Sequence, residues 1–394
     1  MRKITLISIF GVIILFRFTS YAQIVTIPDN NFLQAVIDAG IDTNLDGQIQ
    51  YAEAEAVTKL EVAGTNISDL NGIEAFVNLD TLDCSSNQLT LLDVSKNTKL
   101  ELLFCSVNML STLDVSENTA LKYLACSNNN LISIDVSGNA GLLMLDCGFN
   151  ELEHLNLSAN NSLKVLECYA NRMDSLNLSG NTKLTTLYCS NNLLKRLDLS
   201  ENKALEFLDC QFNDLSEIKL PENSLLNHLA CYSNNLTHLD LTSITDLIHL
   251  DCGMNLFTTL DLSKNLSLVS VDVSQNPHLL SVCVWDTAFV SNNFYFLKDS
   301  TASWTEDCNL STGFDDIQED LAVEIYPNPG RSGFNLILPK SADISVFNAS
   351  GIAMEHHALL RYLQFGHDYQ PGVYLVRIYF PDDAKEFVMK IIKE

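Results

Sequence analysis

The sequence predicts a β-rich solenoid of about ten turns, largely without helices, with a short helical cap before it and a small antiparallel β-sandwich after it. Three observations support this prediction. They are a 21-residue period, the apolar residues that recur within each period, and a change to short β-branched runs near the C-terminus. A fixed period close to 20 residues is typical of solenoids, in which each turn buries its apolar side only against its neighbours.

Cysteine is the clearest marker of the period. Each of these cysteines has a leucine two residues before it and an asparagine three residues after it. We expect the thiols to be buried as small hydrophobes, with a redox or metal-binding role as the alternative. The asparagine amides are expected to satisfy backbone groups between turns. The cysteines recur every 21 residues at Cys84, Cys105, Cys126, Cys147, Cys168, Cys189, Cys210, Cys231 and Cys252.

The repeated pattern is L-x-x-L-x-C-x-x-N-x-L, first seen intact in the unit from Leu79 to Lys99. It resembles the leucine-rich repeat, with cysteine in the place of one leucine, and we assign residues 60–282 to this solenoid. A second half, L-x-x-L-D-V-S-x-N, completes each period. Because both halves show the apolar alternation of a short strand, each turn is expected to have two extended flanks.

Residues 1–22 have the features of a secretory signal peptide. They combine a basic start, an apolar run from Ile4 to Phe16 and a small-residue end. No later stretch approaches the roughly 18 apolar residues that a membrane-spanning helix needs. We therefore expect an exported mature chain without a transmembrane segment.

The chain is strongly acidic, with a formal net charge of -26. Such a surface argues against binding to nucleic acid or to anionic lipid headgroups, because like charges repel. It favours divalent cations or cationic partners. The alternative is that the charge only keeps an exported protein soluble.

Residues 23–59 are expected to form a helical cap that contains an EF-hand-like calcium loop. The segment from Asp42 to Glu53 has oxygen-bearing side chains at loop positions 1, 3 and 5, a glycine (Gly47) at position 6 and a glutamate at position 12. A single loop of this kind is expected to hold calcium in a structural role. The alternative is an acidic surface loop that joins two helices. The expected ligands are Asp42, Asn44, Asp46, Gln48 and Glu53.

Alternate residues of the first strand in each turn are expected to face outward and to form columns along the solenoid. Aromatic and acidic side chains recur in these columns, a mixture that suits protein recognition or the stacking of sugars. The alternative is a solvated strand face with scattered aromatic residues. The expected ligand-binding residues are Asp83, Phe104, Tyr123, Asp146, Glu167, Tyr169, Tyr188, Phe207, Asp209, Tyr232 and Asp251.

Two histidines, His228 and His249, fall in one outward column close to Asp251. Imidazole and carboxylate ligands suit zinc, although a pair of this kind is also compatible with an ordinary polar surface. The sequence contains none of the motifs G-x-S-x-G, H-E-x-x-H or the P-loop. We therefore expect no catalytic residues and no enzymatic activity.

The regular repeat ends after Asn276 and Pro277. Two cysteines outside the ladder, Cys283 and Cys308, are expected to form a disulfide that closes a C-terminal cap over residues 283–308. Residues 309–320 are small, polar and acidic, as is typical of a linker.

The last segment, residues 321–394, consists of short β-branched and aromatic runs separated by Pro, Gly or Asn, which predicts a small antiparallel sandwich. The pieces Tyr326–Pro329, Phe347–Gly351, Pro371–Tyr374 and Lys390–Lys393 resemble the type A C-terminal signal of the type IX secretion system. A basic residue often follows the glycine at position 351, and Ile352 departs from that pattern. The resemblance implies a domain that carries its passenger across the outer membrane and is usually removed. An ordinary terminal binding sandwich is the alternative.

These features together predict a secreted leucine-rich-repeat protein of a Gram-negative bacterium, either attached to the outer membrane at the cell surface or extracellular. Its expected role is recognition or adhesion through the exposed strand face, with an unidentified protein or glycan as partner. The secretion machinery is the expected partner of the C-terminal domain. Glycan capture for nutrient acquisition and a purely structural surface layer are the alternative functions.

Overall fold

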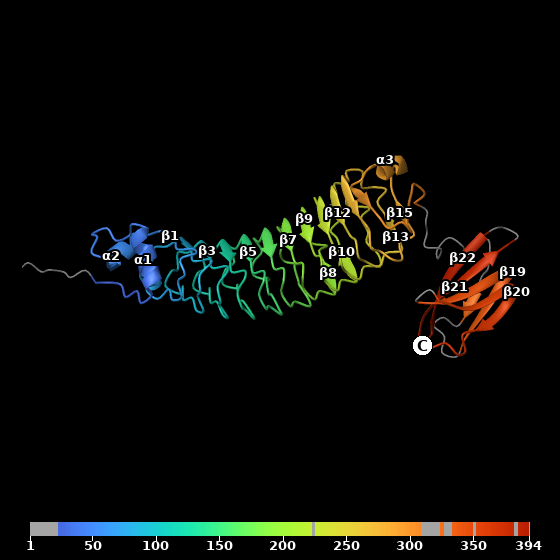
Figure 1. Cartoon of the computed structure of the whole chain (residues 1–394), viewed down its shortest axis with the longest axis horizontal. Helices are drawn as coiled ribbons and strands as arrows, with labels where there is room; N and C mark the ends of the chain where they lie inside the picture. The colour runs from blue at the N-terminus through green and yellow to red at the C-terminus, as the bar shows by residue number, and fades with distance from the viewer. Residues whose placement is uncertain are drawn as a thin grey trace, which may run out of the picture. The chain divides into compact units, whose positions relative to one another are not determined.

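A computed structural model of the chain describes residues 23–222, 225–308, 324–326, 333–349, 352–381 and 385–393 (Figure 1). The expected signal peptide (1–22) and linker (309–320) lie outside these residues. The chain divides into two compact units. The first extends to Phe257 and includes Asn265–His278 and Tyr295–Asp299, and the second contains Thr258–Lys264, Leu279–Phe294 and the residues from Ser300 onward.

The first unit begins with helix α1 (Asn30–Asp38) and the short helix α2 (Tyr51–Ala54). Asp29 precedes α1, and one of its carboxylate oxygens accepts the N–H groups of Asn31 and Phe32, which caps the helix. The other oxygen accepts hydrogen bonds from the backbone and hydroxyl of Ser68. This one carboxylate therefore both starts the helix and ties it to the first turn of the repeats.

The first flank of the solenoid forms one parallel, in-register sheet of 12 strands. The solenoid therefore has about 12 turns rather than about ten, because strands also form where the cysteine marker is absent. The strands, in order, are β1 (Lys59–Glu61), β2 (Thr81–Asp83), β3 (Leu102–Phe104), β4 (Tyr123–Ala125), β5 (Met144–Asp146), β6 (Val165–Glu167), β7 (Thr186–Tyr188), β9 (Phe207–Asp209), β11 (His228–Ala230), β12 (His249–Asp251), β14 (Ser270–Asp272) and β16 (Phe296–Leu297). A 3-10 turn, η1 (Ile73–Ala75), interrupts the second half of the first turn.

The second flank is less regular than the two-flank prediction. Within the described part of the first unit it pairs as a sheet only between β8 (Arg196–Asp198) and β10 (Glu217–Lys219). Opposite charges face each other across that pair, with Arg196 near Glu217 and Lys219 near Asp198. In earlier turns only isolated bridges form, between Asp93 and Asp114 and between Asp114 and Asp135.

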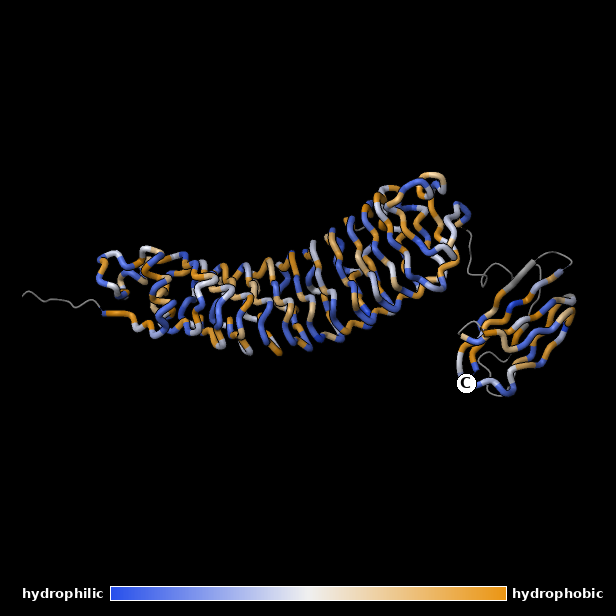
Figure 2. Tube along the Cα trace, viewed as in Figure 1, coloured by the Kyte–Doolittle hydropathy of each residue, from blue (hydrophilic) through white to orange (hydrophobic). Residues whose placement is uncertain are grey.

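The solenoid core is a stack of buried leucines, cysteines and asparagines. All nine cysteines of the ladder are free and fully buried, as expected. Asn129 represents the asparagines that follow them: its amide donates to the carbonyls of Cys105 and Cys126, and its oxygen accepts the N–H of Leu110. Each such side chain therefore joins two turns. Figure 2 shows the resulting alternation of hydrophobic and hydrophilic residues along the turns.

The second unit contains a three-stranded parallel sheet and a five-stranded antiparallel sheet. The parallel sheet consists of β13 (Thr259–Asp261), β15 (Ser281–Cys283) and β17 (Ser303–Thr305), and helix α3 (Thr287–Asn292) lies between the last two in sequence. Asp286 caps α3 by accepting the N–H of Phe289.

The antiparallel sheet is formed by β18 (Glu324–Tyr326), β19 (Phe334–Asn348), β20 (Ala353–Phe365), β21 (Gly372–Phe380) and β22 (Lys385–Lys393). Register shifts along β19 let this long strand pair with β18 and β20 at its start and with β20 and β21 at its end. One sheet therefore encloses a core on its concave side. The core includes Phe334, Leu336, Ile344, Val346, Phe365, Val376, Ile378, Phe380 and Ile391.

Candidate functional site

The outward columns of the first flank arise directly from the register of the sheet. Each three-residue strand buries its central leucine or valine, and its flanking residues point to the other side of the sheet, where most of them are at least partly exposed. The strands pair residue for residue, so that Asp146 lies beside Glu167 and Glu167 beside Tyr188. We call this surface the strand face. The eleven expected ligand-binding residues all lie on the strand face or directly after its strands.

Four rings on the strand face form a continuous aromatic band across β7, β9, β11 and β12. The ring centroids of Tyr188 and Phe207 are 4.8 Å apart, and those of Phe207 and His228 are 4.3 Å apart with nearly parallel planes. His249 follows at 5.5 Å from His228. The sequence placed Tyr188 and Phe207 on this face and left His228 and His249 as either an ordinary polar surface or a metal pair.

The histidine pair is better described as part of this band than as a metal centre. His249 directs Nδ1 to the hydroxyl of Ser270 at 2.8 Å. Among the described residues, only Asp261, Cys283 and Cys308 bring three potential ligand atoms within 4.8 Å of one another. In that group the two cysteines form a disulfide. The ligand atoms of His228, His249 and Asp251 do not come together in this way.

Two further aromatic pairs lie beside the band, at the ends of the strands. Phe149 meets Tyr169 edge to face at 5.3 Å, and Phe212 meets Tyr232 in the same way at 5.5 Å. The two pairs are equivalent positions of the repeat, three turns apart. Asp83, Phe104 and Tyr123 lie in the same columns at the N-terminal end of the face, well before the band.

The residue two positions after each cysteine has a left-handed backbone, and several of these residues are exposed and apolar. Side chains other than Gly, Asn and Asp rarely adopt this conformation. Strain of this kind concentrates at functional sites. The sequence places Phe149 and Phe212 near the strand ends, but it did not single out Val107 and Met254, although apolar residues where other turns have Ser or Asn were a usable signal. The four residues, 48% to 53% exposed, are Val107, Phe149, Phe212 and Met254.

The carboxylates of the central strand face are held in an unfavourable setting. Burial raises the pKa of Asp146, and the hydrogen bonds from Ser127 and Gly148 lower it. Burial has the larger effect, so the pKa is raised overall. Burial, and then the charge of Asp146, raises the pKa of Glu167. Burial likewise raises the pKa of Asp251, with contributions from Asp272 and Asp209. None of the ion pairs between described residues involves these side chains.

A groove of about 650 Å³ opens at the C-terminal end of this region. Met254, Leu256 and Pro277 supply apolar walls, and Asp214 and Asp299 supply carboxylates. Asp299 already accepts the N–H groups of Gln275 and Asn276. The sequence pattern did not indicate this groove, because Asp299 comes from the segment without the repeat.

The cysteines beneath the strand face are fully buried. Burial raises the pKa of the Cys84 thiol to about 12, and burial raises the pKa values of Cys105 and Cys126 well above the usual thiol range. A thiol must ionise to act as a nucleophile or metal ligand. These groups therefore act as packing residues.

The expected calcium loop is compact and held by its own polar side chains. Asp42 accepts the N–H groups of Asp46 and Gly47, and Gly47 has the positive φ of +78° that the bend requires. The Asn44 amide nitrogen lies 3.2 Å from a carboxylate oxygen of Asp46. Glu53 accepts N–H groups of Thr43 and Gln50. Although burial alone would raise the pKa of Glu53, these bonds lower it overall.

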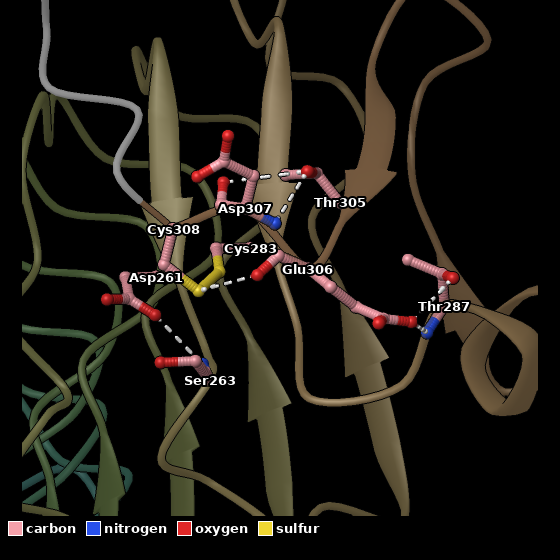
Figure 3. The surroundings of a disulfide bond; sticks show 8 residues. All are labelled: Asp261, Ser263, Cys283, Thr287, Thr305, Glu306, Asp307 and Cys308. Atoms are coloured by element: carbon pink, nitrogen blue, oxygen red, sulfur yellow. Dashed lines mark hydrogen bonds between the residues drawn. A yellow bond between two sulfur atoms is a disulfide. The ribbon is translucent and has the colours of Figure 1, made fainter.

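The second unit contains the disulfide between Cys283 and Cys308, the two cysteines outside the ladder (Figure 3). The bond joins the last residue of β15 to Cys308, which follows β17 in the chain. Close to it, the N–H and hydroxyl of Thr287 both donate to Glu306, which ties α3 to the same region.

Comparisons with known proteins locate similarities in both parts of the chain. Residues 324–394 match the secretion system C-terminal sorting domain. Internalin J of Listeria monocytogenes serotype 4b is 37% identical over 71 residues, which cover 18% of this chain and 8% of that protein. The match thus spans a small part of internalin J.

Solved structures show similarity of fold. An internalin of Listeria monocytogenes, InlF, superimposes with a TM-score of 0.57 at 19% identity, over 75% of this chain and 96% of that chain. The functional domain of InlJ from Listeria monocytogenes, described as including a cysteine ladder, gives a TM-score of 0.46 at 23% identity, over 94% of this chain and 98% of that chain.

None of the helices in the described part of the chain is both long enough and apolar enough to cross a membrane. The repeat, the likeness to InlF and the matched C-terminal domain lead to one description. The chain joins a leucine-rich-repeat solenoid to a type IX secretion sorting domain, and it is a secreted protein attached to the cell surface.

Proposed function

We propose that the protein recognises a partner protein at the cell surface, in recognition or adhesion, through the strand face of the solenoid. The observation that carries this proposal is the aromatic band, in which Phe207 stacks on His228 and Tyr188 contacts Phe207 at a tilt. Rings that remain accessible on a rigid sheet provide large contact area at little cost in conformational entropy. Aromatic residues are also enriched among the side chains that dominate protein interfaces.

The test applies the secreted full chain, in parallel, to an array of extracellular proteins and to a glycan array. We expect a protein ligand whose binding falls at least tenfold when Phe207, Tyr188 or Tyr169 is replaced by alanine. Leu91→Ala is the control, because Leu91 is an exposed apolar residue outside the strand face. If the chain binds glycans and no protein, the proposal of protein recognition is wrong and glycan capture is the function of the strand face. Equal binding by all variants would exclude the strand face as the contact.

We further propose that the loop from Asp42 to Glu53 binds calcium and stabilises the N-terminal region. The donor set supports the proposal, because oxygen-bearing side chains at alternating positions suit a hard cation. The nitrogen of Asn44 lies 2.8 Å from Oε1 of Gln50 and 3.2 Å from Oδ2 of Asp46, so the side chains of three loop positions already converge. Asp42, Asn44, Asp46 and Glu53 would contribute side-chain oxygens, and Gln48 its carbonyl.

Calorimetric titration of the full chain with calcium tests this second proposal, together with thermal melting in calcium and in chelator. At a calcium concentration 100 times the dissociation constant, binding stabilises the native state by about 2.7 kcal/mol. We expect this gain to disappear in an Asp42→Asn, Glu53→Gln variant. Identical melting curves with calcium and with chelator would contradict the proposal.

A further inference from the structure

Carboxylates at the two ends of the strand face are capped by serine. Asp83 accepts the N–H and hydroxyl of Ser85, and Asp272 accepts the same two groups of Ser274. Capping by the residue two positions later is therefore the default for an aspartate in this column.

The central turns lose this cap. The position of the capping serine is occupied there by Gly148, Tyr169, Gln211 and Gly253. From the residue at this position, each central carboxylate accepts at most a backbone N–H. The glycines make room for aromatic rings. A Cβ at Gly148 would lie 2.8 Å from the ring of Tyr169, and one at Gly253 would lie 3.1 Å from the ring of Tyr232. At Gly148 and Gly253 a tyrosine ring thus takes the space of the capping side chain, and Asp146 accepts a hydroxyl from Ser127 of the preceding turn instead.

The two Phe–Tyr pairs, Phe149 with Tyr169 and Phe212 with Tyr232, repeat at an interval that matches an extended chain. Three turns of the sheet span about 14 Å along the solenoid. Four residues of an extended polypeptide span about 13 to 14 Å, and residues at i and i+4 face the same side. One segment lying across the strands can therefore place one side chain at each pair.

Each pair combines ring faces with carboxylates, which is the environment that a cationic side chain prefers. At the first pair, Asp146 accepts the N–H of Gly148, the residue that lies against the ring of Tyr169. At the second pair, Asp251 accepts the N–H of Gly253, the residue that lies against the ring of Tyr232. Lys and Arg bury an apolar stem and keep a charged head at the rim, and they also stack on aromatic faces.

We propose that the strand face binds an extended segment of a partner protein that places Lys or Arg side chains, four residues apart, at the two Phe–Tyr pairs. This inference rests on the proposed function and specifies the chemistry of the partner. A neutral glycan would stack on the rings but leave the carboxylates without counter-charges. A nucleic acid or an acidic glycan would be repelled.

The experiment uses the secreted full chain and fluorescent peptides of Gly, Ser and Thr. One peptide carries two arginines four residues apart, a second carries them adjacent, and a third carries two glutamates four residues apart. We expect the first to bind at least tenfold more tightly than the third and several-fold more tightly than the second in fluorescence anisotropy. Binding should weaken as salt rises, because exposed charges are screened.

Two matched triple variants locate the site. Asp146→Asn, Glu167→Gln and Asp251→Asn remove three strand-face charges, whereas Asp93→Asn, Asp114→Asn and Asp135→Asn remove three charges from the other flank. We expect at least a tenfold loss of binding for the first triple and less than a twofold change for the second. Urea unfolding of both verifies that they fold. Equal losses would show non-specific attraction to an acidic chain and overturn the inference.

The outcomes separate this inference from the proposed function. If no arginine peptide binds but Phe207→Ala still loses a protein ligand from the array, the charge specificity is wrong and the recognition face stands. If the strand-face variants bind every peptide, protein and glycan as the wild type does, both the charge specificity and the recognition face are wrong.

Discussion

The second flank and the central turns of the strand face use carboxylates in opposite ways, although both place them beside a buried residue. On the second flank, the hydroxyl and then the N–H of a residue two positions later lower the pKa values of Asp198 and Asp240. On the strand face, burial raises the pKa values of Asp146 and Asp251. The second flank therefore uses its carboxylates to hold the fold, and the strand face keeps them at a cost to stability. Such a cost is expected where residues serve binding.

The largest expected effect tests whether the two flanks share one core. Leu166 lies under the strand face and Leu178 under the second flank of the same turn, and both are fully buried. Each leucine-to-alanine change should lower the free energy of unfolding by about 3 to 5 kcal/mol, through lost burial and the cavity left behind. Urea unfolding of both variants measures this. A much smaller loss at one site would mean that the flanks differ in packing as well as in surface.

A smaller loss is expected when a second-flank cap is removed. Asp240 accepts the N–H and hydroxyl of Thr242, and Asp240→Ala should cost about 1 kcal/mol at about pH 7. Because the folded pKa is depressed, this stabilisation is present above the unfolded pKa and is lost as pH falls through the folded value. The difference in urea midpoint between variant and wild type should therefore shrink towards about pH 2. A difference independent of pH would contradict a charge-assisted cap.

The matching change on the strand face should act in the opposite direction. Asp146→Asn keeps an acceptor for the Ser127 hydroxyl and removes a carboxylate whose ionised form is disfavoured in the folded state. The free energy of unfolding should therefore rise, by less than about 1 kcal/mol near pH 7 because solvent screens the charge. A raised folded pKa makes the wild type gain stability as pH falls through that value. The advantage of the variant should thus vanish in acid. A variant that is less stable than wild type at about pH 7 would show that the Asp146 carboxylate stabilises the fold, as the second-flank carboxylates do.

The last prediction is that the ladder cysteines do not react in the native protein. Burial raises the pKa of Cys84 to about 12, and the other ladder thiols are buried as deeply. Iodoacetamide at about pH 8 should therefore leave all nine ladder cysteines unmodified in the native protein. In denaturant without reductant nine should react, and with reductant all eleven. Rapid native modification of Cys126 or Cys231 would show that the strand face does not cover the thiols as described.

Much of the architecture follows from the period alone. A strict 21-residue repeat fixes the register, so the inward leucines and cysteines and the outward columns are where the sequence placed them. The pairing of Cys283 with Cys308 follows from their position outside the ladder. The number of turns was underestimated because β16 comes from a segment without the repeat. The second flank is less regular than expected, and within the described part of the first unit it pairs as a sheet only between β8 and β10.

The sequence by itself therefore determined the solenoid, the buried ladders, the sorting domain and the set of outward residues, because a repeating pattern dictates which side chains lose contact with water. The tertiary structure decided which outward residues meet. The stacking of Phe207 on His228, the rings over Gly148 and Gly253, and the groove closed by Asp299 depend on side-chain directions and on a segment that returns from outside the repeat. Such contacts form between turns rather than within them, and no local pattern in the chain specifies them.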